Sequence, residues 1–228
     1  LSDHIKGAGP MNPEEVVGIL KGLCGALVAS HEKGIIHRDL KPANVLLVGP
    51  KEDRRPVLID FGLLKSKRGD ESLTQQGMML GTPTYMAPEQ IQAKGIGPWT
   101  DLYALGVMGY EMLSGANPFR TADLRETVFR QLHHDPRNLS TVDLPKPITR
   151  RLATLIQRLL DKDPGRRIRE ASAVREELRH ALSFSERSTY VVNQIPILRT
   201  PKLRLPLALV LLVLLGAGIG LMLARSNW

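Results

Sequence analysis

The chain has 228 residues, 43% of them hydrophobic and 24% charged, a balance that excludes global disorder and allows one sizeable folded domain with an appendage. The formal net charge of +8 fits a nucleic acid, an anionic membrane surface or a solvated exterior. Because the arginines of the C-terminal half lie among acidic residues, without interleaved aromatic side chains, we expect no nucleic-acid partner. The single cysteine, Cys24, excludes an intramolecular disulfide and is expected to be a small buried residue on a helix.

The first part of the chain predicts one long helix followed by a small β-ribbon. Asn12 and Pro13 are the residue types of an N-cap and a first helical position, and apolar residues recur at helical spacing after them. Gly34 is a natural stop for this helix. Two short apolar runs, 45–48 and 57–59, flank a polar turn with Gly and Pro, which is typical of two paired strands.

The middle of the chain predicts further helices. Residues 100–113 are apolar nearly all round, which indicates a buried central helix. Two amphipathic helices are expected near residues 148–161 and 170–182. The predicted fold class is therefore mainly α, with one small β-ribbon.

A membrane anchor is predicted near the C-terminus. A basic juxtamembrane linker covers residues 183–204, and residues 205–224 form an uncharged apolar run, long enough to cross a bilayer core of about 30 Å as a helix. Basic residues precede this run and one follows it in the short tail 225–228, so we expect a single-pass cell-membrane protein with its large domain in the cytoplasm. A G-x-x-x-G spacing within the run is compatible with a homodimer.

The sequence HRDLKPAN at positions 37–44 carries a carboxylate, a lysine and an amide on one loop. Phosphoryl transfer needs a carboxylate that accepts the proton of an attacking hydroxyl, and Asp39 is that candidate. Lys41 is a cation placed where charge develops on the moving phosphoryl group. Asn44 can offer Mg²⁺ an amide oxygen, and Asp60, which begins an Asp-Phe-Gly sequence, a second metal-binding carboxylate.

A further sequence at 81–89, from Gly-Thr-Pro to Ala-Pro-Glu, follows these motifs in order. With all of them, residues 1–182 resemble the C-terminal lobe of a eukaryotic-like (Hanks-type) Ser/Thr protein kinase of the bacterial membrane-anchored type. The resemblance implies transfer of the γ-phosphate of ATP to Ser or Thr hydroxyls of protein substrates, with Mg²⁺ or Mn²⁺ as the metal. It also implies that Asn44 and Asp60 hold the metal and that Leu46 forms the floor of the adenine pocket.

Residues 37–44 match the catalytic loop of such kinases and are called the catalytic loop below. The same resemblance assigns supporting roles to residues outside it. Asp101 matches an aspartate that braces the backbone of that loop. Glu89 and Arg167 match a buried ion pair that pins the substrate-binding segment. Physical chemistry supports such a pair, because removing one partner leaves a buried charge uncompensated, at a cost of about 3–5 kcal/mol.

Regulation by phosphorylation is also implied by the resemblance. Arg38 matches an arginine that grips a phosphate on the activation segment. Relatives of this type often carry a Thr-x-Thr-Gly pattern there, whereas residues 74–77 read Thr-Gln-Gln-Gly, so the second threonine is replaced. Thr74 remains the candidate phosphosite, and Thr82 is expected to contact the catalytic aspartate and lysine.

A complete kinase also needs an N-terminal lobe with a Gly-rich loop and a phosphate-binding lysine, and the 36 residues before His37 contain neither. We therefore expect the chain, which starts at Leu1, to be an N-terminally truncated fragment that is inactive without that lobe. The alternative is a catalytically inactive kinase-like scaffold (pseudokinase) at the membrane, against which the presence of Asp39, Asn44 and Asp60 argues. A receptor-like sensor, the third alternative, would carry an external domain after the membrane span.

Overall fold

The computed structural model describes residues 1–50, 54–60, 83–142 and 144–183. In chain order they form α1 (Ser2–Ala8), α2 (Pro13–His31), η1 (Pro42–Asn44), β1 (Val45–Val48), β2 (Arg55–Leu58), η3 (Pro83–Tyr85), α4 (Pro88–Ile91), α5 (Pro98–Ser114), α6 (Leu124–His133), α7 (Arg150–Leu159) and α8 (Ala171–Arg179), where η marks a 3₁₀ helix. A mainly helical fold with one small β-ribbon is therefore confirmed for the described residues.

The predicted membrane anchor falls outside this part of the chain. The span predicted at 205–224, the tail 225–228 and, except for its first residue, the linker predicted at 183–204 are not among the described residues. Within the described ranges, no helix is both long enough and apolar enough to cross a bilayer.

The long helix α2 begins where the sequence predicts it. Asn12 has extended backbone angles and precedes Pro13, whose fixed φ suits the first helical position. Two glutamates in the first turn stabilise the helix, because their negative charges lie at the positive end of the helix dipole. The helix ends at His31, and Gly34 turns the chain with a φ of 70° while its N–H donates to the His31 carbonyl at 2.9 Å.

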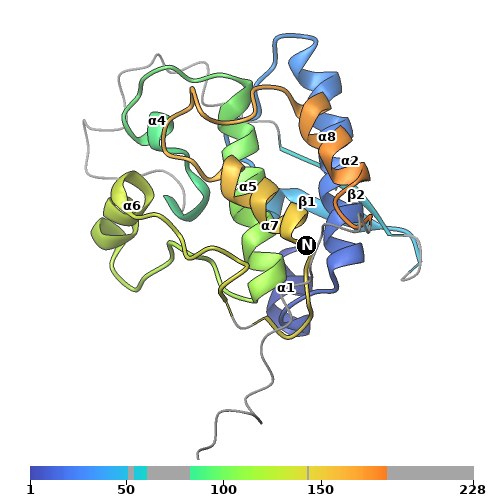
Figure 1. Cartoon of the computed structure of the whole chain (residues 1–228). Coiled ribbons are helices and arrows are strands. Elements are labelled where there is room, and N and C mark those ends of the chain that lie inside the picture. Colours follow the sequence, from blue (N-terminus) through green and yellow to red (C-terminus); the bar gives the residue numbers. More distant parts are fainter. Residues whose placement is uncertain (51–53, 61–82, 143, 184–228) are drawn as a thin grey trace, which may run out of the picture. The chain divides into compact units, whose positions relative to one another are not determined.

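The central helix of the described core is α5. All of residues 100–113 are buried, as their predominantly apolar pattern predicts, and the buried set includes the polar Thr100, Asp101 and Glu111. Gly106 and Gly109 bring α7 close, because a Cβ atom added at these positions would lie 2.7 Å from Leu159 Cβ and 2.6 Å from Ile156 Cδ1. Figure 1 shows α5 running between α2 and α8 on one side and α4 and α6 on the other.

The β-ribbon follows the catalytic loop directly. Its strands β1 and β2 are antiparallel, with Leu46 opposite Val57. The second strand begins two residues before the predicted 57–59 run, and Ile59 lies just beyond it. One face packs on α2, where a Cβ added to Gly22 would meet Pro56 Cγ at 2.5 Å, and the other face exposes Leu46, Val57 and Val48.

Cys24 lies on α2, as expected, and is fully buried. Helix α8 packs along α2, and its Arg175 guanidinium carbon would lie 3.9 Å from a Cβ added at Gly25. Burial raises the pKa of the Cys24 thiol to about 12, and the nearby Arg175 opposes this rise only in part. The thiol is therefore a packed apolar group and is protonated at neutral pH.

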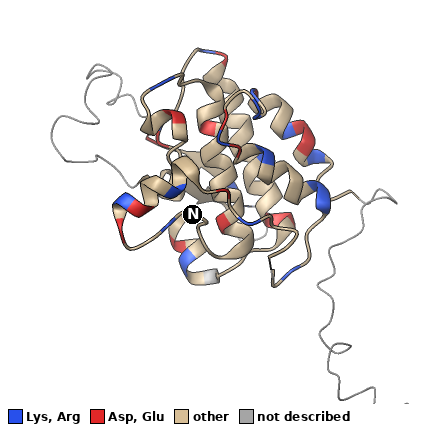
Figure 2. Ribbon diagram, turned by 60° about the vertical axis from the view of Figure 1, so that its left-hand side comes forward, with Lys and Arg blue, Asp and Glu red and all other residues tan. Residues whose placement is uncertain are grey.

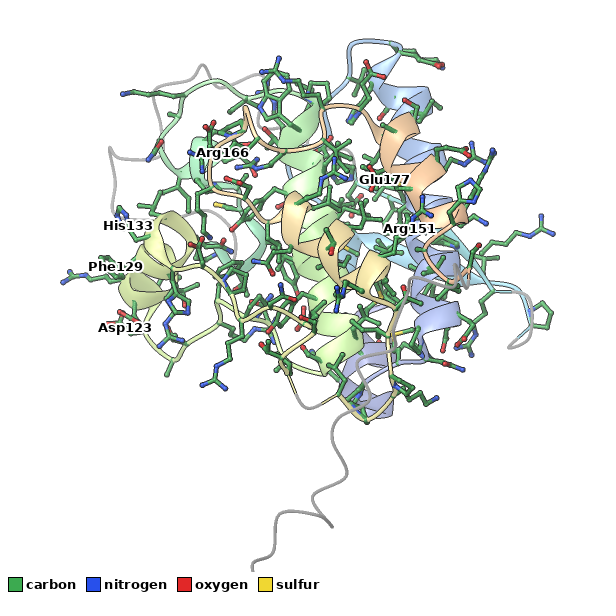
Figure 3. The ribbon with its side chains drawn as sticks, in the orientation of Figure 1. Asp123, Phe129, His133, Arg151, Arg166 and Glu177 are labelled. Atoms are coloured by element: carbon green, nitrogen blue, oxygen red, sulfur yellow. The ribbon has the colours of Figure 1, made fainter. Side chains whose placement is uncertain are left out.

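Acidic and basic residues are interspersed on the surface helices, as Figure 2 shows for α6 and α8. Arg130 pairs with Glu126 along α6, and Arg158 on α7 pairs with Glu177 on α8, each at 2.8 Å. Figure 3 labels Glu177 on α8, together with Phe129 and His133 on the outer side of α6. Such exposed pairs contribute little to stability, so the fold depends on its apolar core and on the buried polar contacts described below.

Candidate active site

The catalytic loop brings together Asp39, Lys41 and Asn44. Lys41 Nζ donates to Asp39 Oδ2 at 2.8 Å, and Asn44 Nδ2 donates to the Asp39 carbonyl at 2.8 Å and to its Oδ2 at 3.3 Å. The 3₁₀ helix η1 produces this arrangement, because it folds the chain back so that Asn44 reaches a residue five positions earlier. The Asp39 and Lys41 side chains remain about a quarter exposed, so the carboxylate is accessible from solvent.

Asp101 on α5 holds the backbone that precedes Asp39. Its Oδ2 accepts hydrogen bonds from the His37 N–H at 2.9 Å and the His31 ring at 2.8 Å, and its Oδ1 accepts one from the Arg38 N–H at 2.9 Å. Arg38 has a φ of 61°, a left-handed conformation that is costly for a residue with a Cβ. A buried carboxylate that binds two successive N–H groups stabilises that conformation.

His37 links the catalytic loop to the end of the ribbon. Its ring is fully buried, its Nδ1 accepts from the Asp39 N–H at 3.3 Å, and its Nε2 lies 3.1 Å from the Ile59 carbonyl. Both contacts are satisfied when the proton is on Nε2. The ring therefore positions the backbone of Asp39 and Ile59.

Asp60 follows Ile59, whose N–H donates to the Asn44 carbonyl at 2.9 Å, so the two expected metal ligands come from adjoining backbone segments. Asp60 is exposed and has a φ of 54°, another left-handed residue. The Asn44 amide nitrogen donates to Asp39, and its oxygen is the atom that can bind a cation. One amide oxygen and one carboxylate fit Mg²⁺, which keeps several waters and phosphate oxygens as ligands.

No group of three or more His, Cys, Asp or Glu side chains is arranged to hold a metal within the described part of the chain. An Asn-plus-Asp set is compatible with this result, because it would leave the other metal positions to substrate oxygens and water. Leu46, the expected floor of an adenine pocket, is 48% exposed on the open face of β1, two residues beyond Asn44.

The segment opposite the catalytic loop is anchored by Glu89 and Arg167. The guanidinium binds the carboxylate through two bonds, of 2.6 Å and 2.8 Å, and both side chains are almost fully buried. Thr100 Oγ1 also donates to Glu89, and Arg167 Nε donates to the Asp161 carbonyl. The pair thus fixes α4 against α5 and the chain that precedes α8.

Three residues that the sequence did not point to complete the region. Gln90 on α4 joins its own helix to the catalytic loop, and Gln131 on α6 donates from Nε2 to the carbonyls of Pro83 and Thr84. Tyr103 donates its hydroxyl proton to Gln131 Oε1. Tyr103 lies in the segment 99–106 around Asp101, and Gln90 directly follows Ala-Pro-Glu, but no spacing rule predicts the contacts of these side chains, so only the fold reveals them.

Lys162 supports the same side of the site. Its Nζ donates to the Tyr103 hydroxyl at 3.0 Å and lies 4.0 Å from the centre of the Phe119 ring. Burial lowers the pKa of Lys162 to about 8, with Arg167 acting in the same direction and Asp135 opposing it.

A small pocket opens between the two sides. Its lining comes from the catalytic loop, from the end of η3 and the residue after it, from α4 and from α5: Arg38, Asp39, Leu40, Lys41, Tyr85, Met86, Gln90, Thr100, Asp101 and Ala104. At its rim, the Tyr85 hydroxyl donates to Glu111 and accepts from Arg120. Burial, followed by the Glu111 charge, raises the pKa of Tyr85, so this tyrosine is a neutral hydrogen-bonding group.

Two expected site residues cannot be placed. Thr74 and Thr82 lie outside the described residues, which resume at Pro83. Their roles as phosphosite and as partner of the catalytic loop stay predictions.

A solvent-accessible carboxylate that is hydrogen-bonded by a lysine and an amide is compatible with a phosphoryl-transfer site. A family model described as protein kinase domain matches residues 1–180. The chain therefore belongs to the protein kinase family.

Several proteins named as serine/threonine-protein kinases are similar to this chain. The chain is similar to serine/threonine-protein kinase Pkn1 of Myxococcus xanthus (38% identity, 76% of this chain and 25% of the relative). It is also similar to PknL of Mycobacterium tuberculosis (34%, 75% and 41%) and to PkaA of Streptomyces coelicolor (36%, 73% and 30%). The chain thus spans between a quarter and about two fifths of the length of these relatives.

Proposed function

We propose that the protein is a Ser/Thr protein kinase that transfers the γ-phosphate of ATP to hydroxyl groups of protein substrates. The observation that carries the proposal is the Asp39 carboxylate, hydrogen-bonded by Lys41 and Asn44 at the edge of a pocket. Membership of the protein kinase family and the Ser/Thr kinase relatives support the reaction type.

The proposed chemistry assigns one task to each loop residue. Asp39 accepts the proton of the substrate hydroxyl. The hydroxyl oxygen forms a bond to the γ-phosphorus, while the bond from that phosphorus to the oxygen of the leaving ADP breaks. Lys41, 2.8 Å from the Asp39 carboxylate, supplies positive charge where the phosphoryl group moves. Asp101 holds the backbone N–H of Arg38, and His37 holds that of Asp39, so that the carboxylate is oriented before substrate binds.

Asn44 and Asp60 would hold Mg²⁺, or Mn²⁺ in its place, through an amide oxygen and a carboxylate. When bound, the metal neutralises charge on the phosphates. Leu46, exposed on β1, offers an aliphatic surface for the adenine ring. We assign these residues to the nucleotide side of the site, and the pocket lined by Tyr85 and Met86 to the protein substrate.

We further propose that Arg38 binds a phosphate on Thr74 of the activation segment, and that Thr82 contacts the catalytic loop. The Glu89–Arg167 pair supports the substrate-binding segment in this scheme. Because Arg38 lines the pocket beside Asp39, a phosphate bound there would act next to the catalytic carboxylate.

The cellular setting is also a proposal. The apolar run 205–224 after a basic linker supports a single-pass cell-membrane protein with its kinase domain in the cytoplasm, and the small-residue spacing in that run supports a homodimer. The 228 residues contain no Gly-rich loop followed by a strand lysine, so we propose that they act as part of a longer kinase.

The test is phosphate transfer from radiolabelled ATP to a generic Ser/Thr protein substrate, with Mg²⁺, by the full-length protein. Asp39→Asn removes the proton acceptor but keeps the side-chain shape, and we expect it to lower kcat by at least about a hundredfold. The matched control is Asp3→Asn, the same change at an exposed position on α1, which should leave activity unchanged.

The pseudokinase alternative predicts a different result. A scaffold would bind ATP or a partner protein without transferring phosphate, so the wild type and Asp39→Asn would be equally inactive. Equal and substantial transfer by both proteins would instead remove Asp39 from its proposed role.

A further inference from the structure

Gln90 bridges the two sides of the candidate active site. Its Nε2 donates to the Arg38 carbonyl at 2.8 Å, across 52 positions of sequence, and its Oε1 accepts from the Ala87 N–H at 3.1 Å. It also lines the pocket together with Asp39 and Lys41. A side chain on α4 therefore contacts the catalytic loop directly.

The bond is made to the peptide group that precedes the proposed proton acceptor. The Arg38 carbonyl belongs to the Arg38–Asp39 peptide, whose N–H donates to His37 Nδ1 at 3.3 Å. The Arg38 N–H is bound by Asp101, and Arg38 has a φ of 61°. This left-handed conformation is costly without external support. The contacts from Asp101 on α5 and Gln90 on α4 therefore together fix the orientation of the Arg38–Asp39 peptide and of the Asp39 side chain that follows it.

At neutral pH a glutamine satisfies both partners of this side chain, whereas a glutamate does not. The Ala87 N–H lies at the start of α4, where amide groups have no partner within the helix, and it needs an acceptor. The Arg38 carbonyl needs a donor. A glutamine amide offers one of each, whereas a glutamate at neutral pH would place a second oxygen against the carbonyl.

We propose that Gln90 is a positioning residue that couples the substrate-binding segment to the catalytic carboxylate. Glu89, the preceding residue, fixes α4 through Arg167, and Tyr85 and Met86 lie just before α4 on the pocket wall. Gln90 thus ties the Arg38–Asp39 peptide to a helix that is itself fixed, beside the wall that a bound peptide would contact. The proposal rests on the kinase function proposed above.

The test compares Gln90→Glu with Gln92→Glu in the full-length protein. Gln92 is exposed at the end of the same helix, so its variant makes the identical chemical change away from the loop. We expect Gln90→Glu to lower kcat for a peptide substrate roughly ten- to a hundredfold, with the KM for ATP changed less than about twofold. Gln92→Glu should match the wild type in both constants.

A pH profile separates positioning from simple damage to the fold. A protonated carboxyl at position 90 can donate to the Arg38 carbonyl again, so the ratio of Gln90→Glu to wild-type kcat should rise as the pH falls from 7.5 to 5.5. A ratio that is flat with pH would overturn the proposal. If Gln90→Glu fails to fold, Gln90→Met serves in its place, and a kcat within twofold of the wild type would overturn the proposal equally.

A readout without catalysis distinguishes failure of this proposal from failure of the kinase assignment. Amide hydrogen exchange of residues 37–44 should be faster in Gln90→Glu than in Gln92→Glu or the wild type. Faster exchange without any wild-type phosphate transfer would refute the kinase function and leave the structural coupling. Unchanged exchange in an active enzyme would refute the coupling alone.

Discussion

The two sides of the pocket are each anchored by a buried carboxylate, but in different ways. Asp101 binds the N–H groups of two successive residues, His37 and Arg38, and so fixes local backbone conformation. Glu89 binds the guanidinium of Arg167, 78 positions away, and so fixes how two distant segments lie together. Asp101 therefore shapes the catalytic loop, whereas Glu89 holds together the segments that form the opposite side of the pocket.

The largest effect on stability is expected from Arg167→Met. The change leaves the Glu89 carboxylate buried without its cation, which should lower the free energy of unfolding by about 3–5 kcal/mol. The measurement is urea-induced unfolding followed by circular dichroism. Arg158→Met is the control, since it breaks an exposed pair and should cost no more than about 1 kcal/mol.

A double variant sharpens this prediction. Glu89→Gln combined with Arg167→Met should lose less than the sum of the two single changes, because neither charge is then left alone. If the losses in unfolding free energy are additive, Glu89 and Arg167 do not act as a pair, and Glu89 does not join distant segments as described.

Asp101→Asn should have a smaller effect on stability and a greater effect on turnover. An asparagine amide can accept only through one oxygen, so one of the N–H groups of His37 and Arg38 loses its partner, at a cost of about 1.5–3 kcal/mol in unfolding. We expect kcat to fall roughly a hundredfold while the KM for ATP stays nearly constant. A rise in KM with unchanged kcat would contradict a role in shaping the catalytic loop.

The smallest effect is a pH dependence carried by Lys162, whose Nζ donates to the Tyr103 hydroxyl. Burial lowers its pKa from 10.5 to about 8, so between these values the unfolded chain binds more protons than the folded one, and stability must rise with pH. The difference in unfolding free energy between the wild type and Lys162→Met should therefore grow in favour of the wild type from pH 7.5 to 9.5. A constant difference would show that Lys162 titrates normally.

The catalytic loop was predictable because its residues are contiguous and their spacing reflects chemistry. Asp39, Lys41 and Asn44 lie within six positions, and the structure brings their side chains together as hydrogen-bond partners. The long helices α2 and α5 were likewise expected, since their apolar patterns extend over many residues. Long regular apolar patterns and contiguous motifs are therefore the features that can be predicted from the sequence.

Contacts between distant polar residues were not predictable. Gln131 is fully buried and binds Tyr103 and the carbonyls of Pro83 and Thr84, yet glutamine is usually a surface residue and no spacing rule joins these positions. Helix α6 was also missed. Its starting signal, Asp123 capping the Arg125 N–H at 2.8 Å, is a single residue followed by a short, mostly polar helix with a weak apolar pattern.

The fully buried thiol on α2 offers a direct way to measure how often the core opens. Cys24 is the only cysteine of the 228 residues, it is fully buried on α2, and its raised pKa keeps it in the unreactive protonated form. A thiol-specific reagent can therefore label this chain only when the core around α2 opens. The labelling rate in native buffer would rank the variants above by how often their cores open, without denaturant and without knowledge of the substrate.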